Sequence, residues 1–83
     1  MAKQDKAREA LASEVSRILR VEREKRSLSL NALAQYAGLS RQMVSYIEQD
    51  LRNPSLDTLL RICDALDILL EDVLRRARKS LQA

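Results

Sequence analysis

The sequence predicts an all-α fold, a compact bundle of five helices, and three observations support this prediction. Apolar residues recur every three or four positions along most of the chain, which is the spacing of one helix face. No segment alternates between apolar and polar residues over the length of a strand. The only glycine and the only proline among the 83 residues, Gly38 and Pro54, lie close together, so few positions interrupt the helices.

The first helix is expected from Asp5 to about Arg26, with Asp5 able to cap its N-terminus. Its apolar stripe consists of Ala7, Leu11, Val15, Ile18 and Leu19. We divide the chain into an N-terminal extension of this helix, residues 1–14, and a single domain, residues 15–83.

The second and third helices are separated by a very short turn. Ser29 is suited to cap the second helix, and Gly38 ends it because glycine adopts the left-handed conformation without steric cost. Ser40 then caps a third helix over about residues 41–49. The inward faces of the two helices are formed by Leu30, Leu33, Ala34 and Ala37, and by Val44 and Ile47.

The segment "DLRNPS" separates the third helix from the fourth. Pro54 lacks an N–H and disfavours helix in the residue before it, and Ser55 is suited to cap the fourth helix. The fourth helix is expected over about residues 56–66 and the fifth over about residues 70–79. Their buried positions are expected to be Leu56, Leu59, Leu60, Cys63 and Leu66, and Leu70, Val73, Leu74 and Ala77.

Composition and charge restrict the class of protein. The net charge is +3, and the basic surplus lies within residues 1–26. No apolar run approaches the roughly 20 residues that span a membrane, and the N-terminus lacks the apolar stretch of a signal peptide. A single cysteine, Cys63, cannot form an internal disulfide, so we expect a reducing, cytoplasmic location. Without histidine, we expect neither a metal site nor a cofactor.

The spacing around Gly38 is typical of two helices that cross steeply. A turn of three or four residues forces the geometry of a helix-turn-helix. Small side chains at Ala34 and Ala37 permit close approach at the crossing, while the branched Val44 and Ile47 fix the third helix on the second. If Leu30 is counted as the first of twenty positions, these residues occupy the positions that define the steric pattern of a helix-turn-helix.

From about Val15 to Ala77 the chain resembles the lambda-repressor-like helix-turn-helix family, of the Xre or Cro/C1 type. The resemblance is carried by "REKRSLSLNALAQYAGLS", "SRQMVSYIEQ" and "RNPSLDTLLRICDALDILLEDVL", in this order and without gaps. It implies five helices and a homodimer that binds a palindromic operator in double-stranded DNA. It also implies transcriptional regulation in the cytoplasm of a bacterium or its phage, at the nucleoid, by a small controller-type protein.

The resemblance assigns DNA reading to the outward face of the third helix. The residues at the matching family positions are Arg41, Gln42, Ser45 and Tyr46, with Ser40 at the cap. Arginine suits guanine O6 and N7, and glutamine pairs with adenine N6 and N7. Ser45 is able to bond a base or a phosphate, and Tyr46 a thymine methyl group or a phosphate. A polar outer face is also what any surface helix shows.

Two further sets of polar residues flank this face. Arg52 and Asn53 precede the fourth helix, whose N-terminus favours a phosphate through its free N–H groups and partial positive charge. The alternative is a solvated loop arginine. Arg23 and Glu48 match a family ion pair that ties the first helix to the third, and Arg23 is also a candidate for contact with the DNA backbone.

The chain departs from the family pattern at loop and cap positions. Asp50 and Asp67 replace loop glycines, and aspartate tolerates the left-handed conformation better than most residues. Leu69 stands where the fifth helix usually has a polar cap. Because an exposed apolar residue costs solubility unless it is covered, we expect a homodimer interface there. Its members are expected to be Ile68, Leu69 and Val73; the alternative is that Leu69 folds back onto its own core.

The leading prediction is a sequence-specific DNA-binding transcriptional regulator with its third helix in the major groove. The alternative is an antitoxin-type or other module whose helix-turn-helix binds a protein partner such as a toxin. It is favoured by apolar residues at Leu30, Leu51 and Leu69. No acid–base pair, nucleophile–base pair or phosphate loop can be assembled, so we do not expect an enzyme. Residues 1–14 carry Lys3, Lys6 and Arg8. The sequence leaves open whether this segment supports dimerisation, contacts DNA or does neither.

Overall fold

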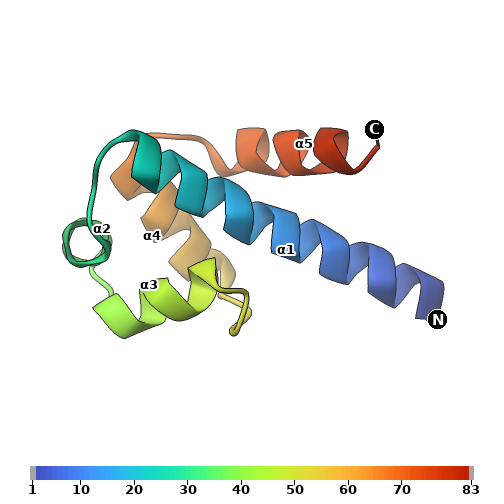
Figure 1. The fold of residues 1–83 in the computed structure, drawn as a ribbon, viewed down its shortest axis with the longest axis horizontal. Coiled ribbons are helices and arrows are strands. Elements are labelled where there is room, and N and C mark those ends of the chain that lie inside the picture. Colours follow the sequence, from blue (N-terminus) through green and yellow to red (C-terminus); the bar gives the residue numbers. More distant parts are fainter. Residues whose placement is uncertain (1, 83) are drawn as a thin grey trace.

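The computed structural model describes the backbone of residues 2–82 and the side chains of residues 5–82. This part of the chain contains five helices and no strand, which confirms the predicted all-α class (Figure 1). The helices are α1 (Ala2–Lys25), α2 (Leu30–Ala37), α3 (Arg41–Glu48), α4 (Leu56–Leu66) and α5 (Leu70–Leu81). None of them is long and apolar enough to cross a membrane.

The first helix, α1, spans the molecule, whose longest extent is 38 Å. It begins at Ala2, so Asp5 lies in its first turn and the prediction of Asp5 as the N-cap was wrong. The Asp5 carboxylate instead accepts a hydrogen bond of 2.6 Å from Arg8. Figure 1 shows α5 alongside α1, with the C-terminal end of α5 above the N-terminal half of α1. The N-terminal half of α1 is therefore packed in part against its own subunit.

The predicted serine caps are all present. In each, the serine hydroxyl accepts a hydrogen bond from the backbone N–H three residues later, which satisfies one unpaired donor of the helix start. The pairs are Ser29 with Ala32 at 3.0 Å, Ser40 with Met43 at 3.0 Å, and Ser55 with Thr58 at 3.1 Å. At the other end of α2, Gly38 has φ +70°, as the predicted left-handed closure requires.

Aspartate does replace glycine at two left-handed positions, as predicted. Asp50 has φ 61° after α3, and Asp67 has φ 57° at the end of α4. A hydroxyl of α1 supports the first of these, because Ser13 donates a hydrogen bond to the Asp50 carboxylate. Ser27, between α1 and α2, also has a positive φ of 55°, which the sequence pattern did not indicate.

The core is formed by the inward faces of all five helices. Its buried members are Val15, Ile18, Leu19, Leu33, Ala34, Ala37, Val44, Ile47, Ile62, Cys63, Leu66, Leu70, Val73 and Ala77. Leu56 and Leu60 were expected inside but are 65% and 43% exposed, whereas Ile62, which was not expected, is 1% exposed. The face of α4 turned to α1 and α2 thus carries Ile62, Cys63 and Leu66, and Leu56 and Leu60 lie at its flank. On α5, Leu74 was also expected inside but is 38% exposed.

Candidate nucleic-acid interface

The two helices α2 and α3 cross steeply at one end of the molecule. Figure 1 shows α2 end-on while α3 lies in the plane of the view. Ala34 and Ala37 are 3% and 4% exposed at this crossing, and Val44 and Ile47 are fully buried. A side chain at Gly38 would place its Cβ 3.1 Å from the Arg61 guanidinium, in a backbone conformation that L-residues rarely adopt. The predicted helix-turn-helix geometry is therefore present.

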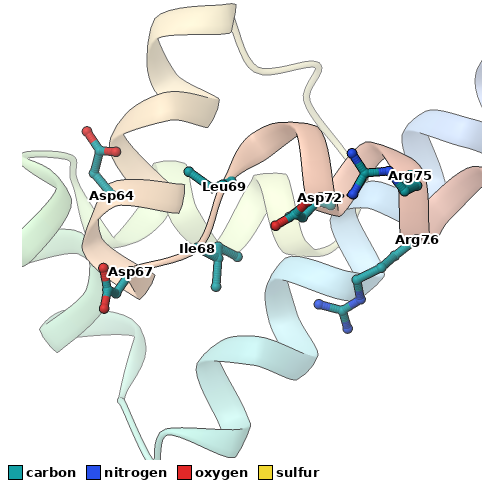
Figure 2. Close-up of a pocket in the computed structure, with 8 residues that line it drawn as sticks. Asp64, Asp67, Ile68, Leu69, Asp72, Arg75 and Arg76 are labelled. Atoms are coloured by element: carbon teal, nitrogen blue, oxygen red, sulfur yellow. Dashed lines mark hydrogen bonds and ion pairs between the residues drawn. The ribbon is translucent and has the colours of Figure 1, made fainter.

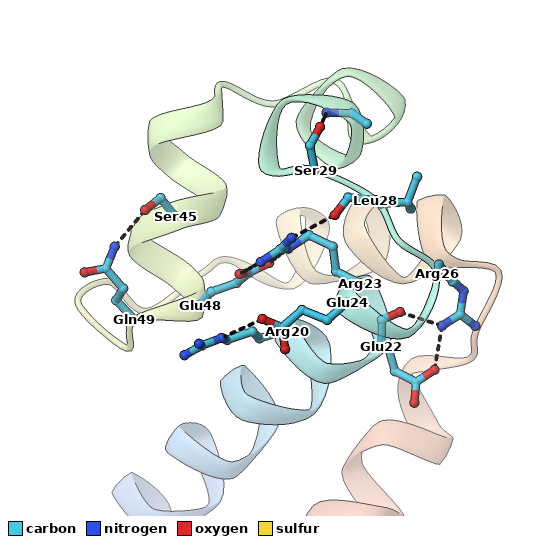
Figure 3. Close-up of polar contacts among 11 residues, drawn as sticks. Arg20, Glu22, Arg23, Glu24, Arg26, Leu28, Ser29, Ser45, Glu48 and Gln49 are labelled. Atoms are coloured by element: carbon cyan, nitrogen blue, oxygen red, sulfur yellow. Dashed lines mark hydrogen bonds and ion pairs between the residues drawn. The ribbon is translucent and has the colours of Figure 1, made fainter.

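An ion pair fixes the C-terminal end of α3 to α1. The Arg23 guanidinium donates through Nε and Nη2 to the Glu48 carboxylate at 2.7 and 2.9 Å, and through Nη1 to the Leu28 carbonyl at 2.8 Å (Figure 3). The two charged side chains are 13% and 6% exposed. The hydrogen bond to Glu48 raises the pKa of Arg23, so its guanidinium stays charged. This confirms the predicted ion pair and gives Arg23 a positioning role.

The outward face of α3 presents polar groups that are already paired with one another. Arg41 and Gln42 are exposed, while Ser45 and Tyr46 are half-buried. The Gln42 amide Nε2 donates to the Tyr46 hydroxyl at 2.6 Å. Further along the helix, Gln49 Nε2 donates to the Ser45 hydroxyl at 2.7 Å (Figure 3). Both contacts join residues four apart, which lie one above the other on a helix.

Gln49 is a member of this face that sequence reasoning missed. It occupies the C-cap of α3, directly after the helix, and was considered only as the end of the helix. The signal was available, because a polar pair at residues 45 and 49 has the spacing of neighbours on a helix surface. Since Ser45 accepts from Gln49, its own hydroxyl hydrogen remains able to donate.

The loop between α3 and α4 places two more predicted residues at the edge of this face. Arg52 and Asn53 are exposed, and the Arg52 guanidinium lies 5.9 Å from the centre of the Tyr46 ring. The adjoining N-terminus of α4 has its cap at Ser55. Asp57 in the first turn of α4 is paired with Arg61 at 2.8 Å.

A second ion cluster, on α1 and α5, holds three further cations away from this face. Glu22 is 4% exposed, and its carboxylate accepts from Arg26 at 2.6 Å, Arg76 at 3.1 Å and Lys25 at 3.4 Å. The bond from Arg26 chiefly, and those from Arg76 and Lys25, lower the pKa of Glu22 to about 2 against the effect of burial. Figure 3 shows Glu22 and Arg26 of this cluster on the side of α1 away from α3. The three cations of this cluster therefore stabilise the fold.

The predicted dimer residues lie around a surface groove of about 760 Å³ at the junction of α4 and α5 (Figure 2). Leu69 is 59% exposed and makes no side-chain cap for α5, so it does not fold back onto the core. Ile68 is partly buried against the core. Val73 has no exposed surface, because α5 turns it fully toward its own subunit. The assignment of Val73 to a dimer interface was therefore wrong, although its place on the buried stripe is confirmed.

The fold and the polar outward face of α3 define the class of protein, a helix-turn-helix DNA-binding transcription regulator. Residues 19–73, about two thirds of the chain, match the helix-turn-helix family. The chain belongs to this family, and the resemblance to its Cro/C1 type is confirmed. No curated protein sequence matches the chain significantly.

Solved structures of two regulators are similar to this one. The clp gene regulator ClgR from Corynebacterium glutamicum is 28% identical, with a TM-score of 0.79 over 87% of this chain and 77% of that one. An alanine mutant of the restriction-modification controller protein C.Esp1396I is 25% identical, with a TM-score of 0.79 over 87% and 94% of the two chains. A phenylalanine mutant of C.Esp1396I, solved bound to its highest affinity operator site, has the same fold at 24% identity and a TM-score of 0.79, over 89% and 97% of the two chains.

Proposed function

We propose that the protein is a sequence-specific transcription regulator that inserts α3 into the major groove as a homodimer on a palindromic operator. One observation carries this proposal: the outward face of α3 presents Arg41 and Gln42 on a helix whose inward face is fully buried. A rigid helix with exposed polar side chains fits the major groove, which admits one α-helix. The similar controller protein C.Esp1396I, solved with its operator, supports the same use of the fold.

The roles we propose follow from where each side chain lies. Arg41 offers a fork of donors to guanine, and Gln42 pairs with adenine. Ser45 has a free hydroxyl hydrogen for a base or phosphate. Contacts with the DNA backbone are assigned to residues at the edges of the face, where the start of α3 and the start of α4 present N–H groups to phosphates. These residues are Ser40, Arg52 and Asn53.

Arg23 acts chiefly by orienting α3. Three of its guanidinium nitrogens are bonded inside the protein, and only 13% of the side chain is exposed. We propose that any contact of Arg23 with the DNA backbone uses its remaining N–H groups, so that it adds affinity without sequence preference.

A dimer would place two copies of α3 about 34 Å apart, in successive major grooves on one face of the duplex. We propose that Ile68 and Leu69 of one subunit pack against the same two residues of the other subunit in this dimer. Leu56 and Leu60 form a second exposed apolar strip on α4, which provides a matched comparison. Leu69→Glu is expected to yield a folded monomer by light scattering, and Leu60→Glu a dimer. The reverse result would move the interface to α4.

Selection from randomised duplexes at two salt concentrations tests the function directly. A preferred palindromic sequence is expected, and with about six to ten phosphate contacts its affinity should fall by roughly 10³–10⁵ between 50 and 200 mM salt. Arg41→Ala should cost about 1–3 kcal/mol at one base pair and relax preference there, whereas Arg52→Ala should weaken all duplexes alike. Equal loss for every duplex in Arg41→Ala would show that Arg41 does not read a base.

A second candidate function rests on the exposed leucines. Leu51 and Leu69 are 64% and 59% exposed, and a protein partner such as a toxin would cover them. DNA binding that is indifferent to sequence, together with a tight protein partner, would favour this antitoxin-type function over regulation by operator binding alone. Either function is that of a protein acting at the nucleoid in the cytoplasm.

A further inference from the structure

Three side chains, two on α3 and one on the loop that follows it, form a connected row before any DNA is bound. Gln42 donates its amide hydrogen to the Tyr46 hydroxyl at 2.6 Å, and the Arg52 guanidinium lies over the Tyr46 ring at 5.9 Å from its centre. Tyr46 is half-buried, whereas its two partners are exposed. The middle residue of the row is thus the one least free to move.

We propose that Tyr46 is a positioning residue, which presents the Gln42 amide as a reader of adenine, and that Arg52 holds Tyr46 in place. The proposal rests on the proposed function of α3 as the reading helix. The family resemblance alone assigned Tyr46 to a thymine methyl group or a phosphate. The row of contacts gives it a different task, which is to set the orientation of a neighbouring side chain.

The chemistry of the amide explains the preference for adenine. A glutamine side chain has one carbonyl acceptor and two N–H donors. When one N–H is held by the Tyr46 oxygen, the groups left for DNA are the carbonyl Oε1 and one N–H. This donor–acceptor pair complements adenine, which offers N6–H as a donor and N7 as an acceptor. An amide turned the other way would present two donors, which suit the two acceptors of guanine.

The row also connects the reading of a base to contacts with the DNA backbone. The Tyr46 hydroxyl accepts from Gln42 and keeps its own hydrogen for a phosphate oxygen or a water. Arg52 attracts the face of the ring through its charge, which disfavours rotation of the ring away from α3. Because Gln42 is already held, it loses less conformational freedom on binding than a free glutamine would. The preference for adenine therefore depends on all three residues.

A double-mutant cycle at one base pair tests the proposal. Affinities are measured for the preferred duplex and for its variants with each base pair replaced, using the wild type, Tyr46→Phe, Gln42→Ala and the double variant. The wild type is expected to prefer adenine about 5- to 150-fold at the position that Gln42 reads. Tyr46→Phe, which keeps the ring and removes only the hydroxyl, should abolish most of this preference. The double variant should lose no more than Gln42→Ala alone.

Other measurements separate this result from general damage. The preference at the base pair read by Arg41 should be unchanged in Tyr46→Phe, and Tyr36→Phe, which removes a hydroxyl from the 70% exposed tyrosine of α2, should change nothing. Arg52→Gln should lower both the overall affinity and the adenine preference; a loss of overall affinity alone would remove Arg52 from the row.

Two results would overturn the role of Tyr46: a full adenine preference in Tyr46→Phe, or an equal loss at every base pair. Losses that simply multiply in the double variant would also do so, because they would show that the two residues act independently. A wild type with no preferred duplex would instead overturn the proposed function itself.

Discussion

Replacement of Glu22 by glutamine should destabilise the fold by an amount that depends on pH. Glu22 is buried beneath three cations, and its pKa falls from 4.5 to about 2. At about 1.4 kcal/mol per pKa unit, the ionised carboxylate contributes about 3 kcal/mol. Lys25 and Arg76 are 65% and 48% exposed, so solvent screens part of their attraction. We therefore expect Glu22→Gln to lower the free energy of unfolding by about 2–3 kcal/mol at pH 7.

The sign of the pH dependence follows from the lowered pKa. Because the unfolded chain binds the proton more tightly, ionised Glu22 stabilises the fold fully above about pH 4.5. This contribution is lost as the pH falls toward 2. The wild-type curve of unfolding free energy should therefore drop through this window more steeply than that of Glu22→Gln, and the two curves should converge at low pH.

Urea unfolding followed by circular dichroism, from pH 7 to pH 2, measures both effects. The neighbouring Glu24 provides the control, because its pair with Arg20 is 3.4 Å long and both side chains are more than half exposed. Glu24→Gln should cost no more than about 0.5 kcal/mol. If Glu22→Gln were as stable as Glu24→Gln at pH 7, or if its curve ran parallel to that of the wild type, the cluster would not stabilise the fold as argued.

Three other predictions concern the packing and capping of α2 and α3. Gly38→Ala should cost about 1–2 kcal/mol in urea unfolding, since its φ of +70° is left-handed; no loss would mean that the turn relaxes. Ser40→Ala removes the bond to the Met43 N–H and should cost about 0.5–2 kcal/mol by the same measurement. Ser80→Ala, which removes a bond between the exposed side chains of Ser80 and Glu14, should cost less. Ile47→Ala should lower the free energy of unfolding by about 2–5 kcal/mol, and a value below about 1 kcal/mol would contradict its place in the core.

Local signals made most of the helix boundaries predictable. A serine that can cap a helix, a glycine that can close one and a proline that excludes one act within a few residues of themselves. The starts of α2, α3 and α4 agree with these signals to the residue. The start of α1 does not, because Asp5 resembles a cap but alanine, lysine and glutamine before it continue the helix equally well.

Burial at the edge of an apolar stripe could not be predicted in the same way. Leu56, Leu60 and Ile62 all fit a helical repeat on α4, and the periodicity does not say which edge of the stripe meets α1 and α2. Leu74 shows the same limit on α5, because it was expected inside but is 38% exposed. Its burial is decided by how α5 lies against α1, an element far from it in the sequence.

In the candidate site, too, some residues could be predicted from the sequence and others could not. The resemblance to a family indicated Arg41, Gln42 and the Arg23–Glu48 pair, because these residues hold fixed positions in a known arrangement. The bond between Gln42 and Tyr46 depends on side-chain orientation, and the Glu22 cluster joins α1 to an arginine of α5 across the fold. The spacing of Gln42 and Tyr46 indicates neighbours on a helix surface but not a bond between them, and the contact between Glu22 and the arginine of α5 has no residue pattern at all, so only the structure reveals these contacts.

In the proposed function, the precision of the reading face depends on residues that lie behind α3. α3 has only 8 residues, and helices shorter than about 12–15 residues are marginal in water. Its order therefore comes from buried Val44 and Ile47 and from the Arg23–Glu48 pair. Loss of this support lowers the affinity for every duplex alike, since α3 must be re-ordered before it can bind any of them. A change in the ranking of duplexes can arise only from the outward side chains, which is why affinity and preference must be measured separately.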